Sequence, residues 1–100
     1  MTGKEKIEQV LGKNKIVLFM KGSPDFPMCG FSARATAILK ELKAEFAHVN
    51  VLDDEDIRQG IKEFGQWPTI PQLYVNKSLV GGSDIMMEMF EAGELAEALQ

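Results

Sequence analysis

The chain has 100 residues, of which 45% are hydrophobic and 26% are charged, and its formal net charge is −4. This composition indicates one folded domain over residues 1–100 and argues against disorder. The negative charge, with no basic stripe, argues against nucleic-acid binding, and no apolar run approaches the roughly 18 residues that span a bilayer. The single cysteine excludes an intrachain disulfide and predicts a reducing compartment. We expect the cytoplasm, and an organelle matrix is the alternative that the sequence leaves open.

The first half of the chain predicts helices and strands in alternation. Thr2 and Glu5 form a capping-box pattern for a helix that ends at Gly12. A loop with two prolines covers residues 22–27. Residues 15–20 form an apolar run, which is typical of a strand buried on both faces. Apolar residues recur at helical spacing over 31–43, and they alternate with polar ones over 47–51, as in a strand.

The second half adds a helix, a hairpin and two more helices. Asp53 or Asp54 can cap a helix that ends at Gly65. After the break at Gly81 and Gly82, we expect Ser83 to cap the next helix, and Gly93 to separate that helix from a short last one. The two strands of the hairpin are predicted over 72–75 and 78–80. The helix after Ser83 is predicted over 84–92.

This order of elements predicts an α/β fold with a thioredoxin-like layout. Four strands form one mixed sheet, and helices cover both of its faces. The first strand–helix–strand unit is expected to be parallel and right-handed, whereas the later hairpin must be antiparallel.

Cys29 lies where the proline-containing loop meets a predicted helix. The helix dipole and a nearby Lys21 both favour the thiolate, which is the form that acts as a nucleophile and as a metal ligand. The alternative, an inert buried cysteine, is disfavoured because Pro27, Gly30 and Ser32 are not core residues. Ser32 occupies the place of the second thiol in a C-x-x-C protein, so an outside thiol must clear any disulfide on Cys29.

Four motifs, in this order, resemble the single-domain, CGFS-type monothiol glutaredoxins: residues 20–24 (MKGSP), 29–32 (CGFS), 67–74 (WPTIPQLY) and 81–85 (GGSDI). The resemblance covers nearly the whole chain. It implies a thioredoxin-like fold, bound glutathione, and a [2Fe–2S] cluster that two chains share. Such a cluster takes four thiolates, of which two would come from the Cys29 residues of the two chains and two from glutathione. Ser83 departs from many relatives, which carry a second cysteine there.

The resemblance also implies which residues hold glutathione. Lys21 and Arg58 would bind its glycine carboxylate. The backbone of Ile70, in a cis-proline turn with Pro71, would pair with its cysteinyl part. Ser83 and Asp84, at a helix start, would bind its γ-glutamyl end. Each feature has a simpler interpretation. The cations can be ordinary surface charges, the proline a strand stop, and the glycine pair before the helix only a turn.

The sequence leaves two functions open, and a third has weaker support. In the first, the protein carries an iron–sulfur cluster as a homodimer and delivers it to apo iron–sulfur proteins. The family resemblance also implies that the chain forms heterodimers with a BolA-type protein. In the second, Cys29 serves as the catalytic residue of a glutathione-dependent thiol–disulfide oxidoreductase, which we expect to be at most a weak enzyme. The third is a sensor of iron or redox state that acts through partner binding.

Overall fold

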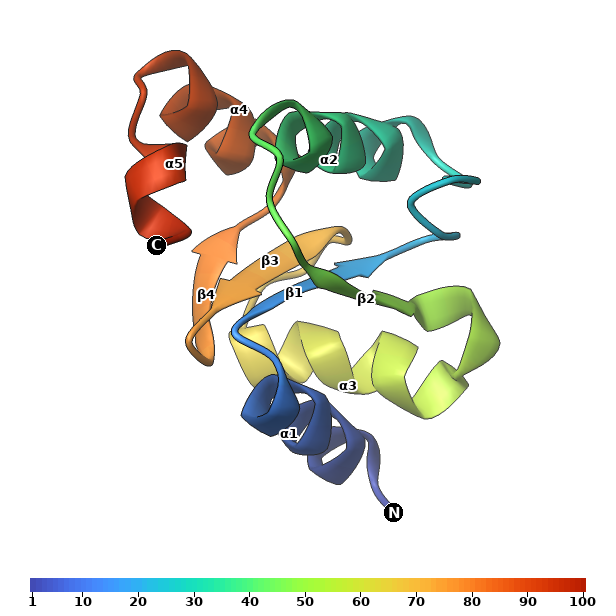
Figure 1. Ribbon diagram of the computed structural model, residues 1–100. Helices are drawn as coiled ribbons and strands as arrows, with labels where there is room; N and C mark the ends of the chain where they lie inside the picture. The colour runs from blue at the N-terminus through green and yellow to red at the C-terminus, as the bar shows by residue number, and fades with distance from the viewer.

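A four-stranded mixed sheet lies between two layers of helices in the computed structural model, which describes residues 1–100 (Figure 1). The strands are β1 (Ile16–Met20), β2 (Ala47–Asn50), β3 (Gln72–Val75) and β4 (Ser78–Gly81). The helices are α1 (Gly3–Lys13), α2 (Gly30–Glu41), α3 (Glu55–Gly65), α4 (Ser83–Glu91) and α5 (Leu95–Ala98), with a 3-10 turn at Val51–Asp53. None of the helices is long and apolar enough to cross a membrane. The layout confirms the predicted fold class.

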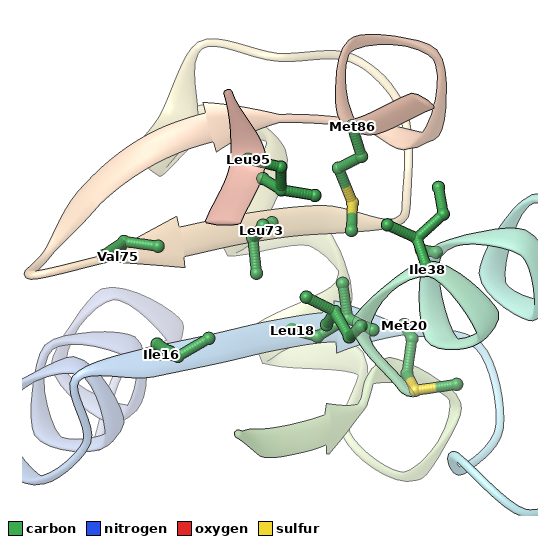
Figure 2. Close-up of a cluster of buried hydrophobic side chains, with 10 residues drawn as sticks. Ile16, Leu18, Met20, Ile38, Leu73, Val75, Met86 and Leu95 are labelled. Carbon is green, nitrogen blue, oxygen red and sulfur yellow. The ribbon is translucent and has the colours of Figure 1, made fainter. Parts of the chain in front are cut away.

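The strand order in the sheet is β2-β1-β3-β4. β1 runs parallel to β2 and antiparallel to β3, and β3 pairs antiparallel with β4, as the sequence pattern predicts. Because successive side chains of a strand point to opposite faces, β1 supplies two separate cores. Leu18 and Met20 pack under α2, α4 and α5 (Figure 2), whereas Val17 and Phe19 pack on α1 and α3. This explains why β1 is apolar at every position.

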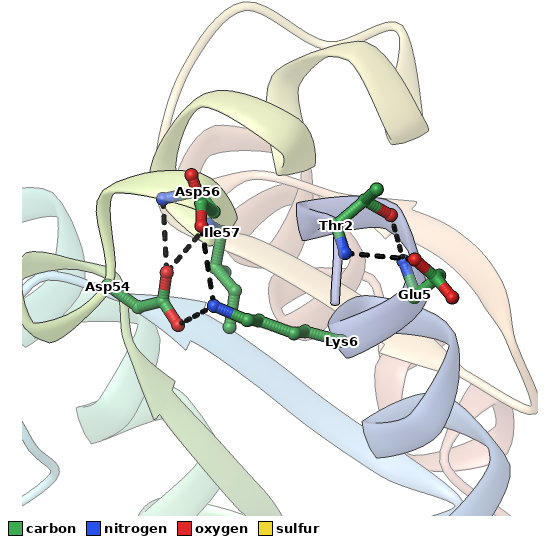
Figure 3. A network of polar contacts seen from close by, with 6 residues as sticks. All are labelled: Thr2, Glu5, Lys6, Asp54, Asp56 and Ile57. Atoms are coloured by element: carbon green, nitrogen blue, oxygen red, sulfur yellow. Dashed lines mark hydrogen bonds and ion pairs between the residues drawn. The ribbon is translucent and has the colours of Figure 1, made fainter.

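An ion pair ties the start of α3 to α1 (Figure 3). The Lys6 Nζ lies 2.9 Å from Asp54 Oδ2 and 3.4 Å from Asp56 Oδ2. Asp54 is also the N-cap of α3, since its Oδ1 accepts from the Asp56 and Ile57 N–H groups. The hydrogen bond from Lys6 outweighs desolvation and lowers the pKa of Asp54. Its stabilising contribution is therefore present above the ordinary carboxyl pKa and is lost as the pH falls through the lowered value.

Several predicted boundaries differ from the structure by one or two residues, and three of the differences have a clear physical reason. The helix predicted over 31–43 is Gly30–Glu41, because Lys43 adopts a φ of 55°, a left-handed conformation that stops a helix. The strand predicted to reach Val51 ends at Asn50, whose side chain caps the 3-10 turn by accepting from the Leu52 N–H. The prediction that Ser83 caps α4 is wrong. Gly82 is the N-cap, without a side-chain bond, and Ser83 is the first helical residue.

Candidate functional site

The sulfur of Cys29 is itself the N-cap of α2. Its Sγ accepts a hydrogen bond from the Ser32 N–H at 3.3 Å and lies 3.3 Å from the Ser32 Oγ. A neutral thiol can donate to that hydroxyl, and a thiolate can accept from it. Cys29 is half-buried, whereas Ser32 is fully buried. The helix start was predicted, but cysteine is not among the usual N-cap residues, so its capping role was not.

These contacts set the charge of the thiol. Desolvation by itself raises the pKa of Cys29, but the hydrogen bonds from the Ser32 side chain, from the Ser32 and Phe31 N–H groups, and the charge of Lys21 together lower it below its ordinary value. Lys21 is held close because its N–H donates to the Ser32 Oγ at 3.0 Å. The direction of this shift agrees with the one that the sequence analysis expects.

Replacing Ser32 with alanine should raise the pKa of Cys29, because the thiolate then loses the hydroxyl that donates to it. The midpoint of iodoacetamide alkylation against pH should move upward, and the rate at neutral pH should fall. Lys21→Gln is the matched comparison and should move the midpoint less, since the Lys21 charge is the smallest of the lowering influences. Equal shifts in the two variants would contradict this ranking.

A groove of about 410 Å³ is lined in part by Lys21 and Phe31, whose charge and N–H group act on the Cys29 thiol. Residues 67–71, in the loop before β3, form one wall, and residues 82–85, at the start of α4, form another. Lys62 near the end of α3 and two residues close to Cys29 in the fold, Lys21 and Phe31, complete the lining. The groove thus brings together four of the predicted residues: Lys21, Ile70, Ser83 and Asp84. These come from distant parts of the sequence, so the fold assembles them.

The lining leaves out Cys29 and one of the two predicted cations, Arg58. Its Nη1 lies 3.9 Å from Glu55 Oε2, one turn back on α3. Lys62 lines the groove instead, and the sequence analysis missed it. The signal was available, because Lys62 lies four residues after Arg58 and therefore on the same helix face.

Unpartnered polar groups gather along this groove. The Ile70–Pro71 peptide bond is cis, as the resemblance implies, and the Ile70 N–H forms no backbone hydrogen bond. The Ser83 Oγ and the Trp67 Nε1 are buried without a partner. Buried polar groups normally find partners, and the α4 N-terminus adds N–H groups that favour an anion. The groove therefore suits an elongated ligand with carboxylates and peptide groups.

Asp84 adds the one carboxylate of the lining. It is exposed, and its Oδ1 lies 3.2 Å from the Nη2 of Arg34 on α2. Elsewhere, no three His, Cys, Asp or Glu side chains gather closely enough to hold a metal ion. Cys29 is the only thiolate that the chain can offer to a metal, so a centre with several thiolate ligands would take the others from other molecules.

Comparison with known proteins gives consistent results. The glutaredoxin family model matches residues 16–80. A monothiol glutaredoxin of Porphyra purpurea is 59% identical over 92 residues, which cover 92% of this chain and 86% of that protein. The solution structure of reduced apo GrxS14 from poplar has a TM-score of 0.84 at 49% identity, over 96% of this chain and 88% of that one. A buckwheat glutaredoxin–glutathione complex has a TM-score of 0.85 at 23% identity, over 97% and 86%, which shows the fold alone.

Proposed function

This chain belongs to the monothiol glutaredoxins of the glutaredoxin family, and we propose that it binds glutathione and, as a homodimer, carries a [2Fe–2S] cluster to apo iron–sulfur proteins. The observation that carries the proposal is the position of the only cysteine: a half-buried N-cap whose thiolate is favoured, beside a groove lined by cations and free peptide groups. We further propose a cytoplasmic location, because a chain with a single cysteine forms no internal disulfide and suits a reducing compartment.

The groove matches glutathione group by group. Lys21 and Lys62 can bind the glycine carboxylate through charge-assisted hydrogen bonds. The free Ile70 N–H can pair with the cysteinyl residue as one strand pairs with another. The N-terminus of α4 suits the γ-glutamyl carboxylate, and Asp84 can accept from the amine. The buckwheat glutaredoxin was solved with glutathione bound, which supports the same class of ligand here.

The number of thiolates supports a shared cluster. A [2Fe–2S] cluster takes four thiolates, and this chain holds one cysteine. Two chains with two glutathione molecules complete the set. Cys29 is half-exposed rather than enclosed, so a second chain can approach it. Because two of the four ligands are small exchangeable molecules, such a cluster suits transfer better than permanent electron carriage.

Apolar side chains around the thiol support contact with protein partners. Phe26, Met28 and Phe31 are 79%, 68% and 57% exposed, and they flank Cys29 in sequence. Large exposed apolar side chains that cluster on a surface often mark a protein interface. We infer that this surface meets the second chain, a BolA-type protein or an apo-protein that receives the cluster.

Anaerobic reconstitution with iron, sulfide and the wild-type protein tests the proposal. With glutathione present, we expect a coloured species whose mass corresponds to two chains, one cluster and two glutathione molecules. Without glutathione, the protein should remain a colourless monomer. Mixing the coloured dimer with an apo-ferredoxin should then move the visible circular dichroism to the recipient. A colourless monomer under both conditions would overturn the proposal.

A second candidate function uses the same thiol. Because the pKa of Cys29 is lowered and its side chain is half-exposed, its thiolate can attack a glutathionylated protein, which releases the protein thiol and leaves glutathione on Cys29 as a mixed disulfide. A second glutathione can then cleave that disulfide, which restores Cys29 and releases oxidised glutathione. A glutathione reductase-coupled assay with a glutathionylated peptide separates the two functions. Turnover near background with normal cluster binding would leave only the carrier.

A further inference from the structure

Gln72 is a polar side chain in a place where the sheet otherwise buries apolar ones. It begins β3, directly after Pro71, and its exposed fraction is 0%. Burial of an amide costs free energy unless its hydrogen bonds are met. Here three of them are: the Nε2 donates to the Trp67 and Thr69 carbonyls at 3.0 and 3.1 Å, and the Oε1 accepts from the Tyr74 Oη at 2.8 Å.

Both carbonyls belong to residues 67–71, the loop that forms one wall of the groove. This loop is neither helix nor strand, and its Thr69 and Ile70 N–H groups form no backbone hydrogen bonds. The side chain of Gln72 therefore supplies contacts that a strand ladder would supply in regular structure. Gly65 leaves room for this arrangement, since a Cβ there would lie 2.8 Å from the Gln72 Oε1 and against the Tyr74 Oη.

The bond to the Thr69 carbonyl has a directional consequence. The only cis peptide bond in the chain joins Ile70 to Pro71, so the Thr69–Ile70 peptide is trans. In a trans peptide the C=O and the N–H point in opposite directions. Because Gln72 holds the Thr69 carbonyl toward the buried side, the Ile70 N–H must point away from it, on the side of the groove that Ile70 lines.

We propose that Gln72 is a positioning residue for ligand binding: its side-chain amide fixes the Thr69–Ile70 peptide so that the Ile70 N–H faces the groove and meets the peptide backbone of glutathione. Gln72 does not itself line the groove and acts only through this loop. The inference rests on the proposed glutathione site, and it adds the residue that orients the donor.

The test compares Gln72→Met, which keeps the length of the side chain but removes its donors, with Tyr74→Phe. The second variant breaks the same buried network at the Oε1 and leaves both loop bonds intact. S-methylglutathione is the probe, because it cannot exchange with the thiol. Trp67 is the only tryptophan and lies in the loop, so its fluorescence reports binding directly. Circular dichroism must first show both variants to be folded.

We expect Gln72→Met to weaken binding at least about tenfold and Tyr74→Phe to weaken it by less than about twofold. The alkylation midpoint of Cys29 should stay at the wild-type pH in both variants, because no contact joins Gln72 to the thiol. Wild-type affinity in folded Gln72→Met would overturn the inference alone, whereas a wild-type protein that fails to bind the probe would overturn the proposed function.

A measurement on the wild-type protein covers the case in which Gln72→Met does not fold. By NMR hydrogen exchange, the Gln72 side-chain amide protons should be protected with and without S-methylglutathione. The Ile70 N–H should exchange quickly in the free protein and become protected when the probe is added. An Ile70 N–H that is already protected in the free protein, or an unprotected Gln72 amide, would contradict the proposed orientation.

Discussion

Cys29→Ser should abolish cluster capture and mixed-disulfide formation with glutathione, while the fold remains intact. In this variant an oxygen replaces the sulfur of the only cysteine. A serine hydroxyl stays protonated at neutral pH, so it can neither bind iron as a thiolate does nor exchange with disulfides. Serine is nevertheless a good N-cap, and it can take the place of the sulfur that caps α2. The absorbance of the reconstituted protein and its mass after treatment with oxidised glutathione measure the two losses.

Cys29→Ala is the matched control, because it removes both the thiol and the cap. We expect Cys29→Ser to keep the wild-type free energy of unfolding and Cys29→Ala to lose about 1 kcal/mol, the usual contribution of an N-cap. Both variants should be colourless after reconstitution. A coloured Cys29→Ser dimer with the wild-type cluster content would show that the cluster is bound elsewhere.

The helices and strands could be predicted because their signals are local. The capping box at Thr2 and Glu5, the all-apolar run of β1 and the hairpin around Asn76 each depend on residues close in sequence. The strand order β2-β1-β3-β4 depends instead on which elements pack together. The residue pattern predicted a parallel first strand unit, an antiparallel hairpin and a thioredoxin-like layout, but it did not predict the order of the strands in the sheet.

The candidate site was harder to predict than the fold, for a geometric reason. Spacing along α3 places Arg58 and Lys62 on one face, but it does not show which of the two lines the groove. The sequence analysis named only Arg58, whereas the lining contains Lys62. The role of Gln72 is invisible in sequence, where it reads only as the first residue of a strand. Its importance comes from two carbonyls that the loop brings within reach.

The residues before Cys29 form a compact turn that the sequence described only as a loop. Gly22 and Pro27 form an isolated bridge, the Met28 N–H donates to the Lys21 carbonyl at 2.9 Å, and the Lys40 Nζ donates to the Pro24 carbonyl at 2.9 Å. This turn connects β1 to α2 and therefore sets where the sulfur emerges relative to the groove. The conformation of this turn depends most on Gly22, because its φ is +93°.

Gly22→Ala should be severely destabilising and should disturb the thiol. Gly22 has a φ of +93°, which an L-residue other than glycine rarely adopts, and a Cβ there would press on the Phe26 carbonyl and lie 2.7 Å from the Met28 backbone nitrogen. Backbone atoms cannot move aside as a flexible side chain can. We expect a loss of about 3 kcal/mol in the free energy of unfolding, measured by urea denaturation. Binding of S-methylglutathione should weaken as well, because the turn that presents Cys29 must shift.

Gly30→Ala is the control at the other side of the thiol. Gly30 is the first residue of α2, its φ is not positive, and a Cβ there would meet nothing within 4 Å. Alanine is also the better helix former, so this variant should keep the wild-type free energy of unfolding to within about 0.5 kcal/mol. The two glycines lie eight positions apart, in the motifs 20–24 and 29–32, and only the earlier one is required by the backbone. Equal destabilisation by both substitutions would mean that the site tolerates no added side chain at all, and that the conformation of Gly22 is not the reason.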